Sequence, residues 1–255
     1  EGPGTGKSVA EWMVLGESEI DLHASDIARF HEHHKTWDHV RSRTGEGFIK
    51  TYGIIHPNEQ WAGNRNIRLS PYYEQEKALG AVFYETVGWE RPWWYESNAG
   101  LVEKFGDAVM PRTGEWEARW WSPIINAEHL QMRETAGIVD LTAFAIFDIV
   151  GPGALASVQQ IAVRQMDVAV GRVVYTPILG INGGFKSDLT IMRLAKDHFR
   201  VVTGGAHGMA DLKWFGDHLA EGASIVDLTS SWTTLGIWGP KAREIMQSLT
   251  NDDLS

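Results

Sequence analysis

Residues 175–190, YTPILGINGGFKSDLT, carry the polar side chains best suited to hold a small ligand. Gly183 and Gly184 precede a run with strand composition, and glycine lets a ligand approach the backbone closely. Asp188 and Thr190 stand at alternate strand positions, so their side chains point to the same side. One carboxylate and one hydroxyl there can hold a ring that bears several N–H donors. The alternative is a hairpin in which Asp188 hydrogen-bonds its own turn, and the residues alone leave both interpretations open.

The opening residues, EGPGTGKS, resemble a phosphate-binding loop. That loop has the pattern G-x-x-x-x-G-K-[ST], and with Gly6, Lys7 and Ser8 as its end the first glycine falls on Glu1. The spacing therefore fails, and a carboxylate at that place would repel a triphosphate. Asp148 ends an apolar run that could serve as a magnesium-binding strand, but apolar strands that contain Asp are common. A glycine turn that leads into a helix is the simpler alternative.

Two further groups of residues have a functional and a structural interpretation. The histidines His31, His33, His34 and His39 are close in sequence, but the zinc pattern H-E-x-x-H would need a histidine where Lys35 stands. A polar helix explains them, and no metal site is predicted.

An aromatic stretch follows in the sequence GWERPWWY, with Trp89, Trp93, Trp94 and Tyr95. Such residues can stack on a sugar or a base. They more often pack one part of a protein against another, since indole and phenol rings bury a large apolar area.

The elements around residues 175–190 have short, strand-like patterns. Strands are expected over residues 143–150, 173–179, 189–194 and 199–202. Gly151 and Pro152 end the first of these and open a helix, and the same strand, Gly-Pro turn and helix recur at 235–249. Such an internal strand-turn-helix repeat indicates an α+β fold.

The first part of the chain has weaker patterns. Residues 9–16 indicate a short helix that ends near a glycine, and residues 49–55 alternate weakly, as a strand would. Residues 96–115 are rich in Gly, Asn and charged residues, which predicts a linker between domains.

Composition excludes several classes of protein. The 255 residues are 43% hydrophobic and 22% charged, as in ordinary globular chains, and the net charge of −10 repels a nucleic-acid backbone. No apolar stretch approaches the roughly 20 residues of a membrane helix. The absence of cysteine excludes disulfides, thiolate metal sites and cysteine nucleophiles.

The chain resembles a known family over nearly its whole length. The runs GTGKSVAEWM, DLHASDIARF and HPNEQWAGNRNIRLSPYYEQEKALGAVFYETVGWERPWW are similar to the region that joins the flavin and folate domains of dimethylglycine and sarcosine dehydrogenases. The runs RETAGIVDLTAFAIFDIVGPGA, GRVVYTPILGINGGFKSDLTIMRL and LGIWGPKAREIMQSLTNDDLS are similar to the folate-binding domain of the aminomethyltransferase of the glycine cleavage system, the T-protein.

The resemblance implies an internal fragment with three parts. Residues 1–45 would be the C-terminal end of an FAD-dependent oxidoreductase domain of the DAO type, and residues 46–104 its central, connecting region. Residues 105–255 would be the N-terminal part of a truncated, T-protein-like folate-binding domain.

The resemblance also implies a set of FAD contacts. Gly4, Thr5, Gly6 and Lys7 match a glycine-rich segment that returns to the flavin and opens a helix, whose free amides would stabilise negative charge. Pro3 stands where relatives usually have glycine.

For tetrahydrofolate, Asp188 matches the family's folate-contacting aspartate, Thr190 its neighbour, and Tyr175 belongs to the same motif. Asp188 is the candidate catalytic residue: it would orient the folate from the side of a pteridine-sized cavity and assist proton transfer. T-protein relatives carry two consecutive acids here, whereas this chain has Ser187 before Asp188.

The activity implied is demethylation of dimethylglycine or sarcosine by FAD, with transfer of the one-carbon unit to tetrahydrofolate. The expected partners are a small N-methyl amine and an electron acceptor for the reduced flavin, with neither nucleic acid nor membrane insertion. The expected location is the cytoplasm, or the mitochondrial matrix in a eukaryote. The alternatives are a folate-dependent aminomethyltransferase or demethylase, a non-catalytic folate-binding module and, last, an NTPase.

Overall fold

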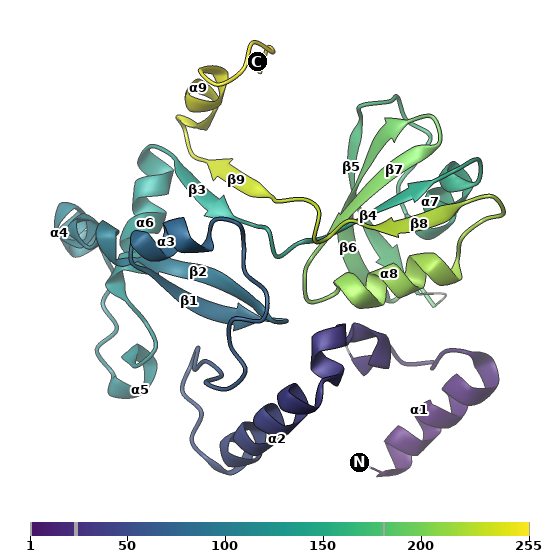
Figure 1. Cartoon of the computed structure of the whole chain (residues 1–255), viewed down its shortest axis with the longest axis horizontal. Coiled ribbons are helices and arrows are strands. Elements are labelled where there is room, and N and C mark those ends of the chain that lie inside the picture. Colours follow the sequence, from purple (N-terminus) through teal and green to yellow (C-terminus); the bar gives the residue numbers. More distant parts are fainter. Residues whose placement is uncertain (1, 23–24, 181, 255) are drawn as a thin grey trace. The chain divides into compact units, whose positions relative to one another are not determined.

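The chain folds into two compact units, which we describe one at a time (Figure 1). The computed structural model describes residues 2–22, 25–180 and 182–254. Unit 1 comprises residues 1–31 and 144–232, and unit 2 comprises residues 32–143 and 233–255. Both contain helices and antiparallel sheet, which confirms the predicted α+β class.

Unit 1 is built on a five-stranded antiparallel sheet with the strand order β5-β6-β7-β4-β8. Its strands are β4 (Ala145–Val150), β5 (Val173–Leu179), β6 (Phe185–Ala195), β7 (His198–Thr203) and β8 (Ser224–Asp227). The strands predicted around residues 143–150, 173–179, 189–194 and 199–202 are therefore confirmed, and β6 begins earlier than expected.

Side chains alternate between the two faces of this sheet, as strand geometry requires. In β6, Ser187, Leu189 and Ile191 are buried, whereas Asp188 is exposed and Thr190 is partly exposed. Phe147, Ile149, Phe199 and Val201 of the neighbouring strands join the same apolar core, so one face of the sheet is closed by packing. We call the other side, which carries Tyr175, Asp188 and Thr190, the open face.

Two helices cover the buried face of the sheet. In α7 (Ala154–Ile161), the buried side chains of Ala154, Ser157, Val158 and Ile161 follow the helical spacing predicted from the sequence. Helix α8 (Gly208–Asp217) approaches β4 so closely that a Cβ on Gly208 would lie 2.4 Å from the Cβ of Ala145. A side chain at that position would force the helix away from the sheet.

Asp211 of α8 ties this helix to the sheet from inside the core. Its side chain is 1% exposed. The hydroxyl of Ser187 donates to Asp211 Oδ2 at 2.9 Å, and the hydroxyl of Thr203 donates to the same oxygen at 2.6 Å. A buried carboxylate is tolerated only when such donors replace water, so these bonds fix α8 against β6 and β7.

The N-terminal segment of unit 1 is helical from its first described residue. Helix α1 spans Gly2–Leu15 and ends at Gly16, whose φ of +85° is typical of a helix C-terminus, so the predicted helix end is confirmed. The predicted glycine turn is wrong, because its residues lie inside the helix. A short 3₁₀ helix, η2 (Ile27–Arg29), follows.

Unit 2 contains a hairpin, a two-stranded sheet and several helices. The hairpin pairs β1 (Ala81–Thr86) with β2 (Trp89–Tyr95), and the other sheet pairs β3 (Gly137–Asp140) with β9 (Leu235–Trp238). The α-helices are α2 (Trp37–Tyr52), α3 (Tyr73–Ala78), α4 (Gly100–Phe105), α5 (Glu115–Ala118), α6 (Pro123–Glu134) and α9 (Ala242–Gln247). Short 3₁₀ helices are η3 (Glu32–Lys35), η4 (Glu96–Asn98) and η5 (Gly106–Ala108).

Two predictions for unit 2 are wrong. Residues 49–52 belong to α2, not to a strand, because Thr36 caps a helix whose turns continue to Gly53. Residues 96–115 are not a linker between the units: α4 lies in this segment, and Asn98 donates to Glu128 Oε1 at 2.8 Å.

The strand-turn-helix repeat is confirmed locally at β4-α7 and β9-α9. Its two copies belong to different units, so it does not build one domain. Within the described residues, no helix is both long and apolar enough to cross a bilayer.

Unit 2 also buries a carboxyl group, that of Glu76, which has few hydrogen-bond partners. Glu76 of α3 is 7% exposed, and its Oε1 accepts a hydrogen bond from the Tyr95 hydroxyl at 3.2 Å. Burial, reinforced by the nearby charge of Asp140, raises the pKa of Glu76 to about 7.

We expect Asp211→Ala to lower the free energy of unfolding of unit 1 by about 3 kcal/mol, because it leaves two buried hydroxyls without their acceptor. Urea unfolding followed by near-UV circular dichroism measures the change. Asp217→Ala is the matched control: its side chain is 51% exposed and pairs with Lys213 on the same helix, so its loss should cost about 0.5 kcal/mol or less. Equal effects of the two variants would contradict the anchoring role of Asp211.

The stability of unit 2 should fall as the pH rises from about 4.5 to about 7. In the folded state Glu76 has a pKa of about 7, whereas in the unfolded chain it releases its proton near pH 4.5. The stabilisation that this difference contributes is therefore fully present below pH 4.5 and is lost as the pH rises through about 7. The loss is roughly 3 kcal/mol. Glu76→Gln should remove this pH dependence in urea unfolding at pH 5 and 7.5. A variant with the same pH slope as the parent would contradict the assignment.

Candidate functional site on the open face of unit 1

The structure brings the three predicted folate residues together. Tyr175 of β5 is the direct cross-strand partner of Thr190 on β6, and its hydroxyl reaches the diagonal neighbour Asp188, where it donates to Oδ2. Diagonal residues on an antiparallel pair lie within reach of long aromatic side chains. The hydrogen bond therefore comes from the facing strand and not from the hairpin turn.

This pair of residues is open to solvent. Tyr175 is 62% exposed, and Asp188 is exposed as well. The hydrogen bond to Asp188, with smaller effects of burial and of the carboxylate charge, raises the pKa of Tyr175. The phenol therefore stays protonated near neutral pH and acts as a donor to Asp188.

Asp188 lines neither of the two cavities described in unit 1. These cavities have volumes of about 280 and about 60 Å³, and the smaller one is lined by residues 17–21 and by the hairpin turn with Gly180, Asn182, Gly184 and Lys186. The expected cavity at Asp188 stays a prediction, and the structure shows these residues as an exposed patch on the sheet.

Farther along the same face, Asp148 forms a closed ion cluster. Arg200 donates to its two carboxylate oxygens at 2.8 and 3.0 Å, and His198 lies 2.6 Å from Oδ2. Burial alone would raise the pKa of Asp148, but these hydrogen bonds hold it below its usual value. The Arg200 guanidinium also lies over the Trp232 ring at 4.3 Å. Both carboxylate oxygens of Asp148 are thus engaged by Arg200 and His198 within unit 1.

The residues predicted to contact FAD have a different local structure from the one expected. Gly4, Thr5, Gly6 and Lys7 lie within helix α1, and the Lys7 ammonium pairs with Glu11 at 3.2 Å and Glu19 at 3.0 Å. Residues 2–15 form no phosphate-binding loop, and together with the pairing of Asp148 this overturns the NTPase interpretation. The FAD contact itself stays a prediction.

The histidines of unit 2 lie on two polar helical segments, His33 and His34 on η3 and His39 on α2, and their rings contact one another. The ring centroids of His33 and His34 are 3.9 Å apart, and those of His34 and His39 are 4.9 Å apart. Burial and the neighbouring cations lower the pKa of His33 and of His39. In the described part of the chain, no group of three or more His, Cys, Asp or Glu is arranged to hold a metal ion.

The aromatic stretch of residues 89–95 packs within unit 2. Trp93 contacts Tyr84 across the hairpin at 5.8 Å between ring centroids, and the Trp94 indole donates to Glu96 at 2.7 Å. These contacts support the interpretation that the aromatic side chains serve packing, and the packing is within unit 2.

Two features of unit 1 were missed by sequence reasoning. One is the buried Asp211, whose signal was a lone acid in the apolar run GMADLKWF. The other is a cavity beside Trp12 and Trp214, residues far apart in sequence that no spacing rule relates.

Two models of known protein families together match nearly the whole chain. The model of the GCVT N-terminal domain matches residues 72–255, and that of the FAD dependent oxidoreductase central domain matches residues 15–70. The chain belongs to the GCVT N-terminal domain family. The predicted resemblance is confirmed, and the two matches meet at residues 70–72, earlier than the predicted start of the folate domain at 105. The predicted domain limits stay predictions.

The chain is also similar in sequence to known oxidoreductases. The chain is 34% identical over 255 residues to 4-methylaminobutanoate oxidase (formaldehyde-forming) of Paenarthrobacter nicotinovorans, covering 99% of the chain and 30% of that protein. It is 29% identical over 289 residues to human mitochondrial sarcosine dehydrogenase, covering 100% of the chain and 31% of that protein. The chain thus spans about 30% of the length of these relatives.

A solved structure supports the GCVT fold. The glycine cleavage system aminomethyltransferase T from Bartonella henselae matches with a TM-score of 0.56 and 22% identity, covering 72% of this chain and 44% of that one.

We expect Asp188→Ala to lower the pKa of Tyr175, because the neutral phenol then loses its carboxylate acceptor. NMR titration of ¹³Cζ-labelled tyrosine measures this shift. Asp167→Ala, which removes another exposed carboxylate of unit 1, should leave the pKa of Tyr175 unchanged. An unaltered titration in Asp188→Ala would show that the two side chains are not bonded in solution.

Proposed function

We propose that this chain is the connecting and folate-binding part of an FAD- and tetrahydrofolate-dependent oxidoreductase that demethylates N-methylated amino acids. The observation that carries the proposal is the succession, in one chain, of an FAD dependent oxidoreductase central domain and a GCVT N-terminal domain. Sarcosine, dimethylglycine and 4-methylaminobutanoate are candidate substrates of the whole protein, which would pass electrons from the reduced flavin to a separate acceptor.

The open face of unit 1 fits tetrahydrofolate by its donor and acceptor chemistry. Asp188 offers an exposed carboxylate, and a carboxylate that accepts one bond from Tyr175 retains capacity for further N–H donors. The pterin ring presents several such donors. Thr190 would add a hydroxyl contact beside it, and the Tyr175 ring would provide a flat wall.

The residues of the pair have separate roles in this proposal. Tyr175, held protonated, keeps the Asp188 carboxylate turned toward the patch. Asp188 would orient the folate and hold a proton at its carboxylate when the ring nitrogen needs one. Bound tetrahydrofolate supplies the nucleophilic nitrogens that capture a one-carbon unit.

The described residues do not form a cradle for FAD by themselves. Gly4 and Gly6 lie in α1: the amide of Gly4 is in the first turn and has no partner within the helix, whereas that of Gly6 is used within it. We therefore derive no step through the flavin, and the contact of residues 4–7 with FAD is a proposal for the whole protein.

A second candidate is a folate-binding module without catalysis of its own. Its support is that the folate patch lies within unit 1, so it does not require the flavin. Both candidates share folate binding, and they differ in whether the whole protein oxidises an N-methyl amine.

Tetrahydrofolate should quench the tryptophan fluorescence of the chain in a saturable manner. Asp188→Ala should weaken this binding about tenfold, because it removes a charged hydrogen-bond acceptor. Asp167→Ala is the control for the loss of one exposed carboxylate and should bind as the parent does. Equal affinity of Asp188→Ala and the parent would remove the residue from the site.

A further inference from the structure

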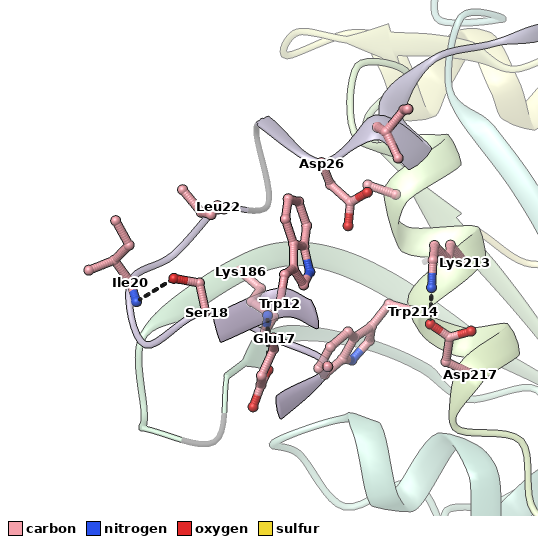
Figure 2. Close-up of a pocket in the computed structure, with 13 residues that line it drawn as sticks. Trp12, Glu17, Ser18, Ile20, Leu22, Asp26, Lys186, Lys213, Trp214 and Asp217 are labelled. Atoms are coloured by element: carbon pink, nitrogen blue, oxygen red, sulfur yellow. Dashed lines mark hydrogen bonds and ion pairs between the residues drawn. The ribbon is translucent and has the colours of Figure 1, made fainter. Parts of the chain in front are cut away.

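A cavity of about 280 Å³ lies within unit 1, away from the residues assigned to folate (Figure 2). Its walls come from α1, from the segment that follows it up to η2, from the start of β6 and from α8. This volume is close to the lower limit of small-molecule pockets, so the cavity suits a small ligand. The polar and aromatic side chains that line it are Trp12, Glu17, Ser18, Asp26, Lys186, Lys213, Trp214 and Asp217.

Most charges around this cavity are already paired. Lys186 lies 4.0 Å from Glu17, and Lys213 pairs with Asp217 one helical turn away. Asp26 is different: its Oδ1 accepts a hydrogen bond from the backbone amide of Ala28 at 2.7 Å, and within the described residues no cation lies within ion-pair distance of its carboxylate. The Arg29 guanidinium lies close by, but it donates to the Asp26 backbone carbonyl at 2.8 Å, so among the described residues the Asp26 carboxylate has no ion-pair partner.

The aromatic rings of the cavity favour a cation as well. The Lys186 ammonium lies 4.2 Å from the centroid of the Trp214 ring, so this indole already attracts a positive group. Figure 2 shows the Trp12 indole and the Asp26 carboxylate bordering the same space. Indole faces next to a carboxylate are the chemistry that recognises methylated ammonium groups.

We propose that this cavity binds a small methylated ammonium ion, held by the indole rings of Trp12 and Trp214 and by the carboxylate of Asp26. The inference rests on the cavity alone and does not depend on the proposed function. Lys186 competes with such a ligand, because its ammonium occupies the Trp214 ring and repels a second cation.

The probe is tetramethylammonium chloride, titrated into the full chain and followed by the indole N–H signals of Trp12 and Trp214 in NMR spectra. tert-Butanol is the neutral probe of similar shape, and sodium chloride controls for ionic strength. We expect saturable shifts with tetramethylammonium and none with the other two.

Two substitutions should change the affinity in opposite directions. Asp26→Asn, which keeps the oxygen that accepts the Ala28 amide, should weaken tetramethylammonium binding about fivefold or more. Lys186→Met, which removes the competing ammonium, should tighten it about threefold. A site for anions would give the reverse, since Lys186→Met would then weaken binding.

The matched controls lie in unit 2. Asp38→Asn removes one exposed carboxylate, and Trp116→Leu removes an indole that is 54% exposed, so both should leave the affinity unchanged. Far-UV circular dichroism establishes that each variant is folded. Binding of tert-butanol with equal affinity, an unchanged affinity in folded Asp26→Asn, or weaker binding in Lys186→Met would each overturn the proposal.

Discussion

The open face of unit 1 depends on a single buried carboxylate. The Asp211 side chain is removed from water, so its oxygens require hydrogen-bond donors, which the hydroxyls of Ser187 and Thr203 supply. These donors belong to neighbouring strands, β6 and β7. A slip of β6 by one residue would break the Ser187 bond and turn every side chain of the strand to the opposite face. The requirement to satisfy Asp211 thus sets which residues of β6 face the core and which face out.

The candidate site follows from that register. Because Ser187 and Leu189 face the core, Asp188 and Thr190 must lie on the open face, next to Tyr175 of β5. The same alternation places Asp148 and Arg200 on this face, where they neutralise each other under Trp232. Tyr175 and Asp188, in contrast, lie on a part of this face that is exposed to solvent.

Local patterns predicted most of unit 1 because its strands are short, alternating and bounded by turn residues. The same reasoning placed Asp188 and Thr190 on one side of a strand, as the structure does. It failed at residues 2–7, where three glycines suggested a turn although the residues lie in a helix. It also failed at residues 49–55, where weak alternation suggested a strand although most of these residues belong to a capped helix. Glycine content and weak periodicity are poor guides when neighbouring turns continue a helix.

What the sequence could not supply depends on contacts between distant segments. Trp12 and Trp214 line one cavity although about two hundred residues separate them, and Asp211 meets its partners only after the sheet has formed. The expectation of a cavity at Asp188 rested on the family resemblance and stays a prediction, whereas the structure shows Asp188 and Tyr175 as exposed. The family resemblance suggested the chemistry that we propose for this patch, whereas whether the patch is enclosed depends on contacts between distant segments.

The central claim is that tetrahydrofolate binds the patch of Tyr175, Asp188 and Thr190 on the open face. Amide chemical-shift mapping of the ¹⁵N-labelled chain during titration with tetrahydrofolate tests it most directly. We predict that the largest shifts cluster in β5 and the middle of β6, on residues 173–179 and 187–192. Shifts confined to other residues, such as those around Trp12 and α8, would contradict the claim.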